Sequence, residues 1–344
     1  MSVRLHRDDL PALACAARMQ GSGGGGSPRL MELLLPRAVE WPIDVVDVAE
    51  ADPQTPCCAV AFAGSTMVLT ERFVDRDPFA RLIDAAERWL GTSIPSVCAM
   101  EGGGINALVP LLCEGLMVVD ADLSGRAVPS LDQMSIFVDE LPGLITVCET
   151  GGGGLAVLET DRPADIEALV RASMVRSGGA GAVLLAGFTV GDLADHAITG
   201  HTARGLALGR AFLESAEATA AEAADAIGAR LIGIGRVAAI DHDRDDPHLS
   251  VFDIRTAQGE VLRVVARSEF LAVILDGAPV ATAPDAIIAI DVLSHAILEI
   301  ADLTVNAHVA VLVIEAAPWW WDRAGRAEAV LPSAYGLTGV DVRA

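Results

Sequence analysis

Three carboxylate side chains follow short apolar runs in the first half of the chain. Glu101 comes directly after the run 96–100, and Asp120 and Asp122 come at the end of the run 116–119 or just after it. Apolar runs this short predict buried strands, and ligands gather beyond the carboxyl ends of parallel strands. A carboxylate held there can take a proton from water during hydrolysis of a polarised carbon. We therefore expect Glu101, Asp120 and Asp122 to be the catalytic residues.

Groups that could hold a substrate lie close to these acids in the sequence. A guanidinium can bind a carboxylate through two hydrogen bonds, and glycine turns let a ligand reach backbone amides. The predicted substrate-binding residues are Gly23, Gly24, Gly25, Gly26, Gly103, Gly104, Asn106 and Arg126. Each group also has a structural interpretation, because glycines form tight turns and aspartates cap loops or pair with arginines. Spacing alone leaves both interpretations open.

Strand and helix patterns place these residues in an α/β domain. Helices are predicted to end near Gln20, to begin again at Ser27, and to extend without a break over 202–227. Asn106 is expected to cap a helix that runs to Cys113 between two apolar strands. Strand, glycine turn, short helix and strand together indicate a βαβ unit.

The pattern changes after Gly228. Short runs of β-branched residues replace the Ala-rich helices, and Asp276-Gly277 is a typical hairpin turn. Such spacing is typical of a small β-sandwich or barrel. We therefore predict two domains: an α/β domain over 1–228, which contains the site, and a β-rich domain over 229–344.

Composition narrows the classes of partner and cofactor. A formal net charge of −23 over 344 residues disfavours nucleic acid and anionic membranes, and no apolar run reaches the roughly 20 residues of a membrane span. No lysine occurs, which excludes pyridoxal phosphate attachment and a P-loop lysine. The six cysteines lack metal or redox spacing and indicate a cytoplasmic protein. We expect a small-molecule substrate, and no cofactor except at most one divalent metal ion.

Several short motifs occur in a recognisable order along the chain. They are the glycine run 21–26, Glu101-Gly102-Gly103 with Asn106, Val119-Asp120-Ala121-Asp122 followed by Gly125-Arg126-Ala127, Asp276-Gly277, and Ala334-Tyr335-Gly336. In this order they resemble the S-methyl thiohydantoin desulfurase family over nearly the whole chain. The resemblance implies an α/β domain joined to a β-rich domain. It also implies hydrolysis of an S-methyl thiohydantoin to a hydantoin with loss of methanethiol.

Three hypotheses about function follow. The first is a hydrolase of a hydantoin-like ring with Asp122 or Glu101 as general base. The second is a metal-dependent cyclic amidohydrolase, in which Asp120, Asp122 and His201 hold the metal ion. The third is a non-catalytic subunit of a hydantoinase-type complex, with Trp319–Trp321 as its contact. We also expect the chain to form a homo-oligomer.

Overall fold

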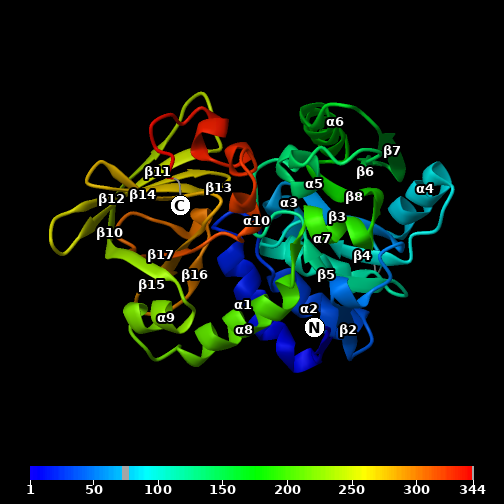
Figure 1. Ribbon diagram of the computed structural model, residues 1–344. Helices are drawn as coiled ribbons and strands as arrows, with labels where there is room; N and C mark the ends of the chain where they lie inside the picture. The colour runs from blue at the N-terminus through cyan, green and yellow to red at the C-terminus, as the bar shows by residue number, and fades with distance from the viewer. Residues whose placement is uncertain (72–76, 343–344) are drawn as a thin grey trace.

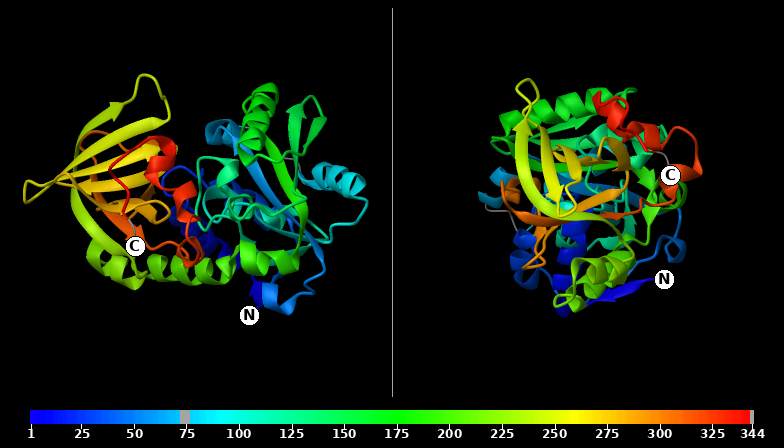
Figure 2. Two further views of the ribbon diagram at one scale, coloured as in Figure 1. Left: turned by 45° about the horizontal axis from the view of Figure 1, so that its top comes forward. Right: turned by 90° about the vertical axis from the view of Figure 1, so that its left-hand side faces the viewer.

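The chain folds into two halves that lie side by side, as Figures 1 and 2 show. The computed structural model describes residues 1–71 and 77–342. Within these residues the first half is a nine-stranded mixed sheet with helices on both faces, and the second half is an eight-stranded antiparallel sheet. The predicted fold class, an α/β portion followed by a β-rich portion, is confirmed.

The first sheet is built from strands of three to ten residues with one shorter edge strand. They are β1 Val3–Leu5, β2 Ile43–Val46, β3 Pro56–Gly64, β4 Ser96–Ala99, β5 Met117–Asp122, β6 Ile145–Gly151, β7 Gly154–Leu158, β8 Ala180–Thr189 and β9 Ile198–Thr199. Their order is β1-β2-β5-β4-β3-β8-β6-β7, and β9 pairs with β5. Strands β2, β5, β4 and β3 are parallel neighbours. The predicted parallel pair β4 and β5 is therefore present, and the carboxyl ends of both strands meet at one edge.

Helices cover both faces of this sheet because its strands bury side chains on both sides. The helices of the chain are α1 Leu10–Gln20, α2 Arg29–Ala38, α3 Thr66–Glu71, α4 Ala80–Leu90, α5 Ser135–Val138, α6 Pro163–Arg176, α7 Val190–His196, α8 His201–Glu214, α9 Ala220–Ala226 and α10 Trp319–Asp322. Of these, α9 packs against the sheet of the second half. Alternate residues of a strand point to opposite faces. In β3, Cys58 and Val60 enter the core beside α1, α2 and α4, whereas Cys57 and Ala59 enter the core beside α5, α6 and α7.

The second half is one continuous sheet that curves around its own core (Figure 2). Its strands are β10 Arg230–His242, β11 Leu249–Thr256, β12 Val261–Arg267, β13 Glu269–Leu275, β14 Ala278–Thr282, β15 Ala286–Asp291, β16 Ile297–Leu298 and β17 His308–Ile314. Their order is β14-β13-β12-β11-β10-β17-β15-β16. Phe252 and Phe270 pack in the enclosed core with Ile287 from the other end of the sheet. The predicted hairpin turn is present, with φ of 45° at Asp276 and 87° at Gly277.

Two predicted helices differ from the structure. The single helix expected over 202–227 is wrong, because α8 ends at Glu214 and α9 begins at Ala220. The Thr219 side chain accepts from the Glu222 N–H and the Glu222 carboxylate accepts from the Thr219 N–H, which starts a new helix. A capping box of this kind favours a helix start over helix continuation.

The helix expected from Asn106 to Cys113 is also wrong. This segment forms two short 3-10 helices, Gly104–Ala107 and Val109–Leu112. Pro110 explains the interruption, because it lacks the N–H that would bond the carbonyl of Asn106 in an α-helix. The Asn106 side chain caps no helix and is free to bond elsewhere.

The glycine run after α1 joins the two halves through close backbone contacts. The Phe270 N–H donates to the Ser22 carbonyl over 2.8 Å, and the Ile300 N–H donates to the Gly23 carbonyl over 2.9 Å. A side chain at Gly24 would overlap the Ser268 carbonyl, and one at Gly104 would overlap the carbonyl of Gly25. The run is therefore a packed junction between the sheets.

A residue from the far end of the chain also ties the halves together. Helix α10 follows β17 and returns to the first half, where Trp320 Nε1 donates to the Ser124 carbonyl over 3.0 Å. Trp319 and Trp320 are both buried in the core of that half. A partner contact through the tryptophans would therefore have to rest on Trp321.

We predict that Gly104→Ala destabilises the protein strongly, whereas Gly115→Ala does not. Both glycines have positive φ, so each substitution places an alanine in the left-handed backbone region, which costs about 1–2 kcal/mol. Only Gly104 faces a backbone atom, whereas Gly115 faces open space. The overlap should add about 1–3 kcal/mol to the loss. Chemical denaturation of both variants measures the difference, and equal losses would contradict the packed junction.

Candidate active site

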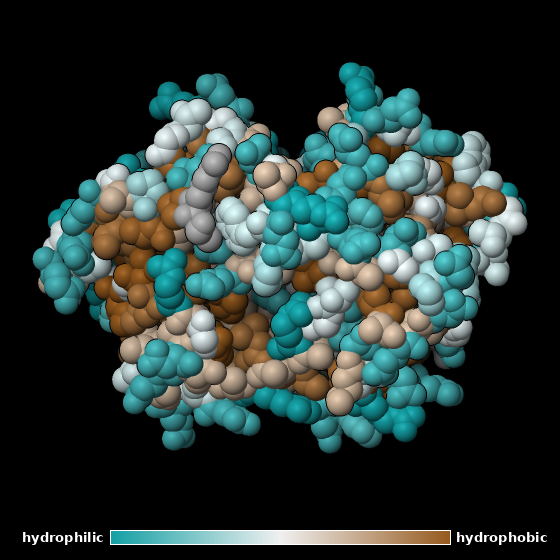
Figure 3. Space-filling view, viewed as in Figure 1, coloured by the Kyte–Doolittle hydropathy of each residue, from teal (hydrophilic) through white to brown (hydrophobic). Residues whose placement is uncertain are grey.

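A cleft of about 520 Å³ lies between the two halves of the molecule. Figure 3 shows a notch at the top of the view, where α6 and the turn between β10 and β11 face each other. The first half contributes Glu101, Asn106, residues of α3 and α6 and the segment 128–131 to its lining. The second half contributes His248, Ser268 and Glu269. The cleft therefore needs both halves to be complete.

Glu101 is held in this cleft by an amide clamp at the end of β4. Its Oε2 accepts from Asn106 Nδ2 over 2.6 Å, and its Oε1 accepts from the Val128 N–H over 3.1 Å. Asn106 is itself fixed on β3, because it donates to the Phe62 carbonyl over 3.0 Å and accepts from the Phe62 N–H over 2.8 Å. The carboxyl of Glu101 therefore has one defined position.

A second acid, Glu269, enters the same cleft from the start of β13. It is buried, and its Oε2 has no hydrogen-bond partner among the described residues. Ser268, just before it, has φ of 64°, so the chain bends sharply at the point where Glu269 enters the cleft. A buried carboxyl without a partner is costly as an anion, so it favours the protonated form.

The two acids hold their protons more tightly than exposed glutamates do. Burial, with a smaller effect of the Asp122 charge, raises the pKa of Glu101 to about 7, against the lowering effect of the hydrogen bonds from Asn106 and Val128. Burial and the nearby charge of Glu101 raise the pKa of Glu269 to about 8, opposed by Arg126. Near neutral pH the pair therefore contains one carboxylate and one carboxylic acid. Such a pair can act as general base and general acid together.

The other two predicted catalytic residues lie behind the cleft and do not line it. Asp120 Oδ1 accepts from the N–H of Thr202 over 2.6 Å, and its Oδ2 accepts from the N–H of Ala203 over 3.3 Å. It therefore caps the N-terminus of α8. Asp122 is fully buried, and its Oδ1 accepts from the N–H groups of Ser124 and Gly125.

Arg126 also lies outside the cleft lining, in the contact between the halves. Its guanidinium donates to the carbonyls of Ala127 over 2.8 Å, Phe270 over 3.0 Å and Asp285 over 2.6 Å. It is buried, so we interpret it as a tie between the halves. The arginine that does line the cleft is Arg171, on α6.

The glycines predicted to bind substrate fall into two groups, one inside and one outside the lining of the cleft. Gly24 and Gly25 line the cleft, but the N–H groups of both donate to the Gly21 carbonyl over 3.0 Å, so neither offers a free amide donor to a ligand. The others lie outside the lining and pack against backbone or side chains: Gly23, Gly26, Gly103 and Gly104.

Among residues 1–71 and 77–342 no group of three or more histidine, cysteine, aspartate or glutamate side chains is arranged to hold a metal ion. In that part of the chain no helix is long and apolar enough to cross a membrane.

Two models of one protein family match this chain. The model of the S-Me-THD-like N-terminal domain matches residues 8–160, and that of the S-Me-THD-like C-terminal domain matches residues 161–344. The chain belongs to the S-Me-THD-like family. Members of this family resemble S-methyl thiohydantoin desulfurase, so the resemblance found in the motifs is confirmed.

A solved structure shares the fold of this S-Me-THD-like protein. It is the crystal structure of a protein from Chromobacterium violaceum, determined by a structural genomics consortium. The two chains are 22% identical, the match covers 99% of each, and the TM-score is 0.79. A search of curated proteins gave no match.

Sequence reasoning about this S-Me-THD-like protein missed Glu269. The residue lies in the β-rich region, far in sequence from Glu101, whereas the site is predicted within residues 1–228. One local signal was available: Glu269 directly precedes the apolar run Phe270–Leu275, and an acid at the start of a buried strand is unusual unless it is used.

We predict that the protein loses stability as pH rises from about 5 to about 8. Both acids have a raised pKa, so in this range the folded state binds more protons than the unfolded state, and rising pH favours unfolding. Glu269→Gln should flatten this dependence, and Glu217→Gln, at an exposed position, should not. Thermal unfolding of the three proteins across this pH range measures the effect. A wild-type slope that Glu269→Gln leaves intact would refute the assignment.

Proposed function

We propose that the protein hydrolyses an S-methyl thiohydantoin to a hydantoin and releases methanethiol. The observation that supports it is the pair of cleft acids, Glu101 and Glu269, with raised pKa values of about 7 and about 8. Membership of the S-Me-THD-like family indicates the class of ring. The reaction adds water to a ring carbon that carries nitrogen and sulfur, which requires a base for the water and an acid for the ring.

The two acids can supply both proton transfers. Glu101, as carboxylate, takes a proton from water while the water oxygen bonds to the ring carbon. Glu269, as carboxylic acid, gives its proton to the ring nitrogen, which neutralises the charge that develops there. The resulting adduct carries a hydroxyl group and the methylthio group on one carbon.

When this adduct breaks down, both acids return to the protonation states that they had at the start. The carbon–sulfur bond breaks, and the sulfur leaves as methanethiol with the proton that Glu101 took. The hydroxyl proton passes to Glu269 as the carbonyl forms, which restores its carboxylic acid.

We expect Glu101→Gln and Glu269→Gln each to lower kcat by about a hundredfold or more, because each removes one proton transfer. The assay follows thiol release from an S-methyl thiohydantoin with detection of the hydantoin by mass. Glu217→Gln, at an exposed position, serves as the control and should keep full activity. Near-normal turnover in both active-site variants would contradict the proposal.

The rate should also depend on pH as a narrow bell. Activity needs Glu101 ionised and Glu269 protonated, so kcat/KM should rise as pH approaches about 7 and fall above about 8. Residual activity of Glu269→Gln should lack the fall at high pH. A profile that stays flat from pH 6 to pH 9 in the wild type would be inconsistent with this acid–base pair.

Arg171 should select substrates with a carboxylate tail. It lies in the cleft lining and pairs with Glu167, so a second carboxylate within reach can share its guanidinium. We expect Arg171→Gln to raise KM for a tailed substrate about tenfold while kcat changes little. An untailed S-methyl thiohydantoin should show no such change. An equal rise in KM for both substrates would argue against this selection.

A further inference from the structure

A second cavity, of about 570 Å³, lies between the halves, and it shares no lining residue with the cleft described above. Its walls come from α8 and α9, from Pro284 and Ala286, and from the segment 314–318 with Trp320. Figure 3 shows apolar residues gathered on the same face of the molecule, over α9, β15 and β17. The first half of the molecule supplies most of its polar groups.

A buried aspartate–histidine pair lies at the wall of this cavity. Asp122 Oδ2 and His201 Nδ1 are 3.2 Å apart, and both side chains are buried. Neither atom has a well-aligned hydrogen bond to any described residue, and each lies within ion-pair distance of the other. The aspartate therefore favours a proton on Nδ1 of His201.

This arrangement prepares the other ring nitrogen to bind a ligand. With the proton on Nδ1, Nε2 is a hydrogen-bond acceptor. His201 lines the cavity, and around it stand mainly apolar side chains such as Leu208, Ile227 and Trp320. An acceptor at one end of an apolar cavity matches a molecule with an apolar body and one O–H or N–H donor.

A structural role for the pair does not account for these features. Asp120 already caps α8, so Asp122 and His201 are not needed to satisfy the start of that helix. Asp122 Oδ1 fixes the loop at Ser124 and Gly125, which leaves Oδ2 for the histidine alone. Burying two ionisable groups costs free energy that a packed apolar pair would avoid.

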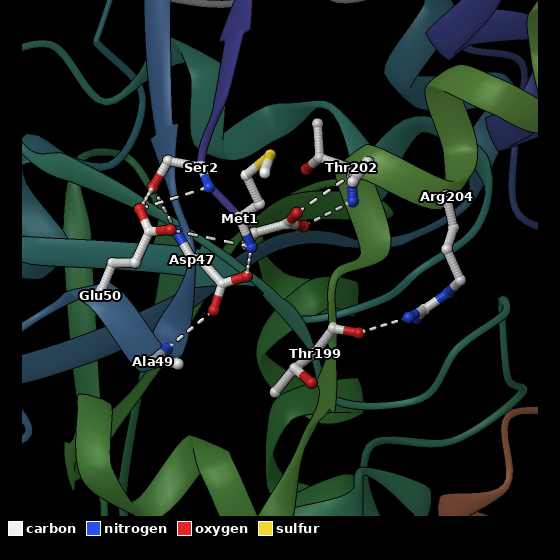
Figure 4. Close-up of polar contacts among 10 residues, drawn as sticks. Met1, Ser2, Asp47, Ala49, Glu50, Thr199, Thr202 and Arg204 are labelled. Carbon is white, nitrogen blue, oxygen red and sulfur yellow. Dashed lines mark hydrogen bonds and ion pairs between the residues drawn. The ribbon is translucent and has the colours of Figure 1, made fainter.

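We propose that this cavity binds a small aryl or alkyl molecule with a single hydroxyl or N–H donor, which hydrogen-bonds to His201. Asp122 orients the imidazole for this purpose. Arg204, on the same wall, is held back by its hydrogen bond of 2.6 Å to the Thr199 carbonyl (Figure 4).

The test compares two probes, 4-propylphenol and 4-propylanisole, in which a methyl group replaces the hydrogen of the hydroxyl donor. Calorimetric titration of the full-length protein should show saturable binding of the phenol, about tenfold tighter than the anisole. His201→Phe should remove this difference. Ala211→Trp, which places a large side chain into the cavity from α8, should abolish binding of both probes and leave thiol release unchanged.

The same titrations can also contradict the proposal. Equal affinity for the two probes in the wild type, absence of saturable binding, or binding that persists in Ala211→Trp would each overturn the proposal. Because Ala211→Trp leaves Asp122 and His201 intact, its result stands even if His201→Phe does not fold. The outcome is independent of the hydrolase assay, since the two cavities have different linings.

Discussion

The buried guanidinium of Arg126 is the interaction on which both halves of the molecule depend. It donates to three backbone carbonyls, those of Ala127 in its own loop and of Phe270 and Asp285 in the second half. A buried guanidinium costs several kcal/mol unless its N–H groups are bonded, so these carbonyls must keep their positions. Phe270 directly follows Glu269 in β13. The tie between the halves therefore also places the second acid of the cleft.

The parts of the fold that depend on neighbouring residues were predictable from the sequence. The turn at Asp276-Gly277 and the parallel pair β4 and β5 follow from turn chemistry and from apolar runs. The long helix and the helix at Asn106 were wrong, because a capping box and a proline outweighed the composition around them. The curvature of the second sheet depends on contacts between its two ends, and no local pattern carries that information.

The candidate site was predictable only in its first half. Glu101 and Asn106 line the cleft as their position after β4 indicates. Asp120 and Asp122 lie on the same face of β5 as Val118. The Val118 side chain packs in the core that also contains α1 and Leu206 of α8. The two aspartates therefore point toward α8 and away from the end of the strand. The alternation of side-chain direction along β5 could therefore have predicted from the sequence that both aspartates point toward α8. Glu269 is different, since its place beside Glu101 results from packing between distant segments.

The position of β8 has a consequence for how this protein can be divided. The two family models meet after residue 160, but β8 lies at 180–189 and pairs with β3 on one side and β6 on the other. A fragment cut at that border would leave β3 with a row of unpaired backbone N–H and C=O groups. Open edges of this kind recruit other chains. Recombinant halves made from the family boundary would therefore aggregate, and a productive cut must keep β8 with β3.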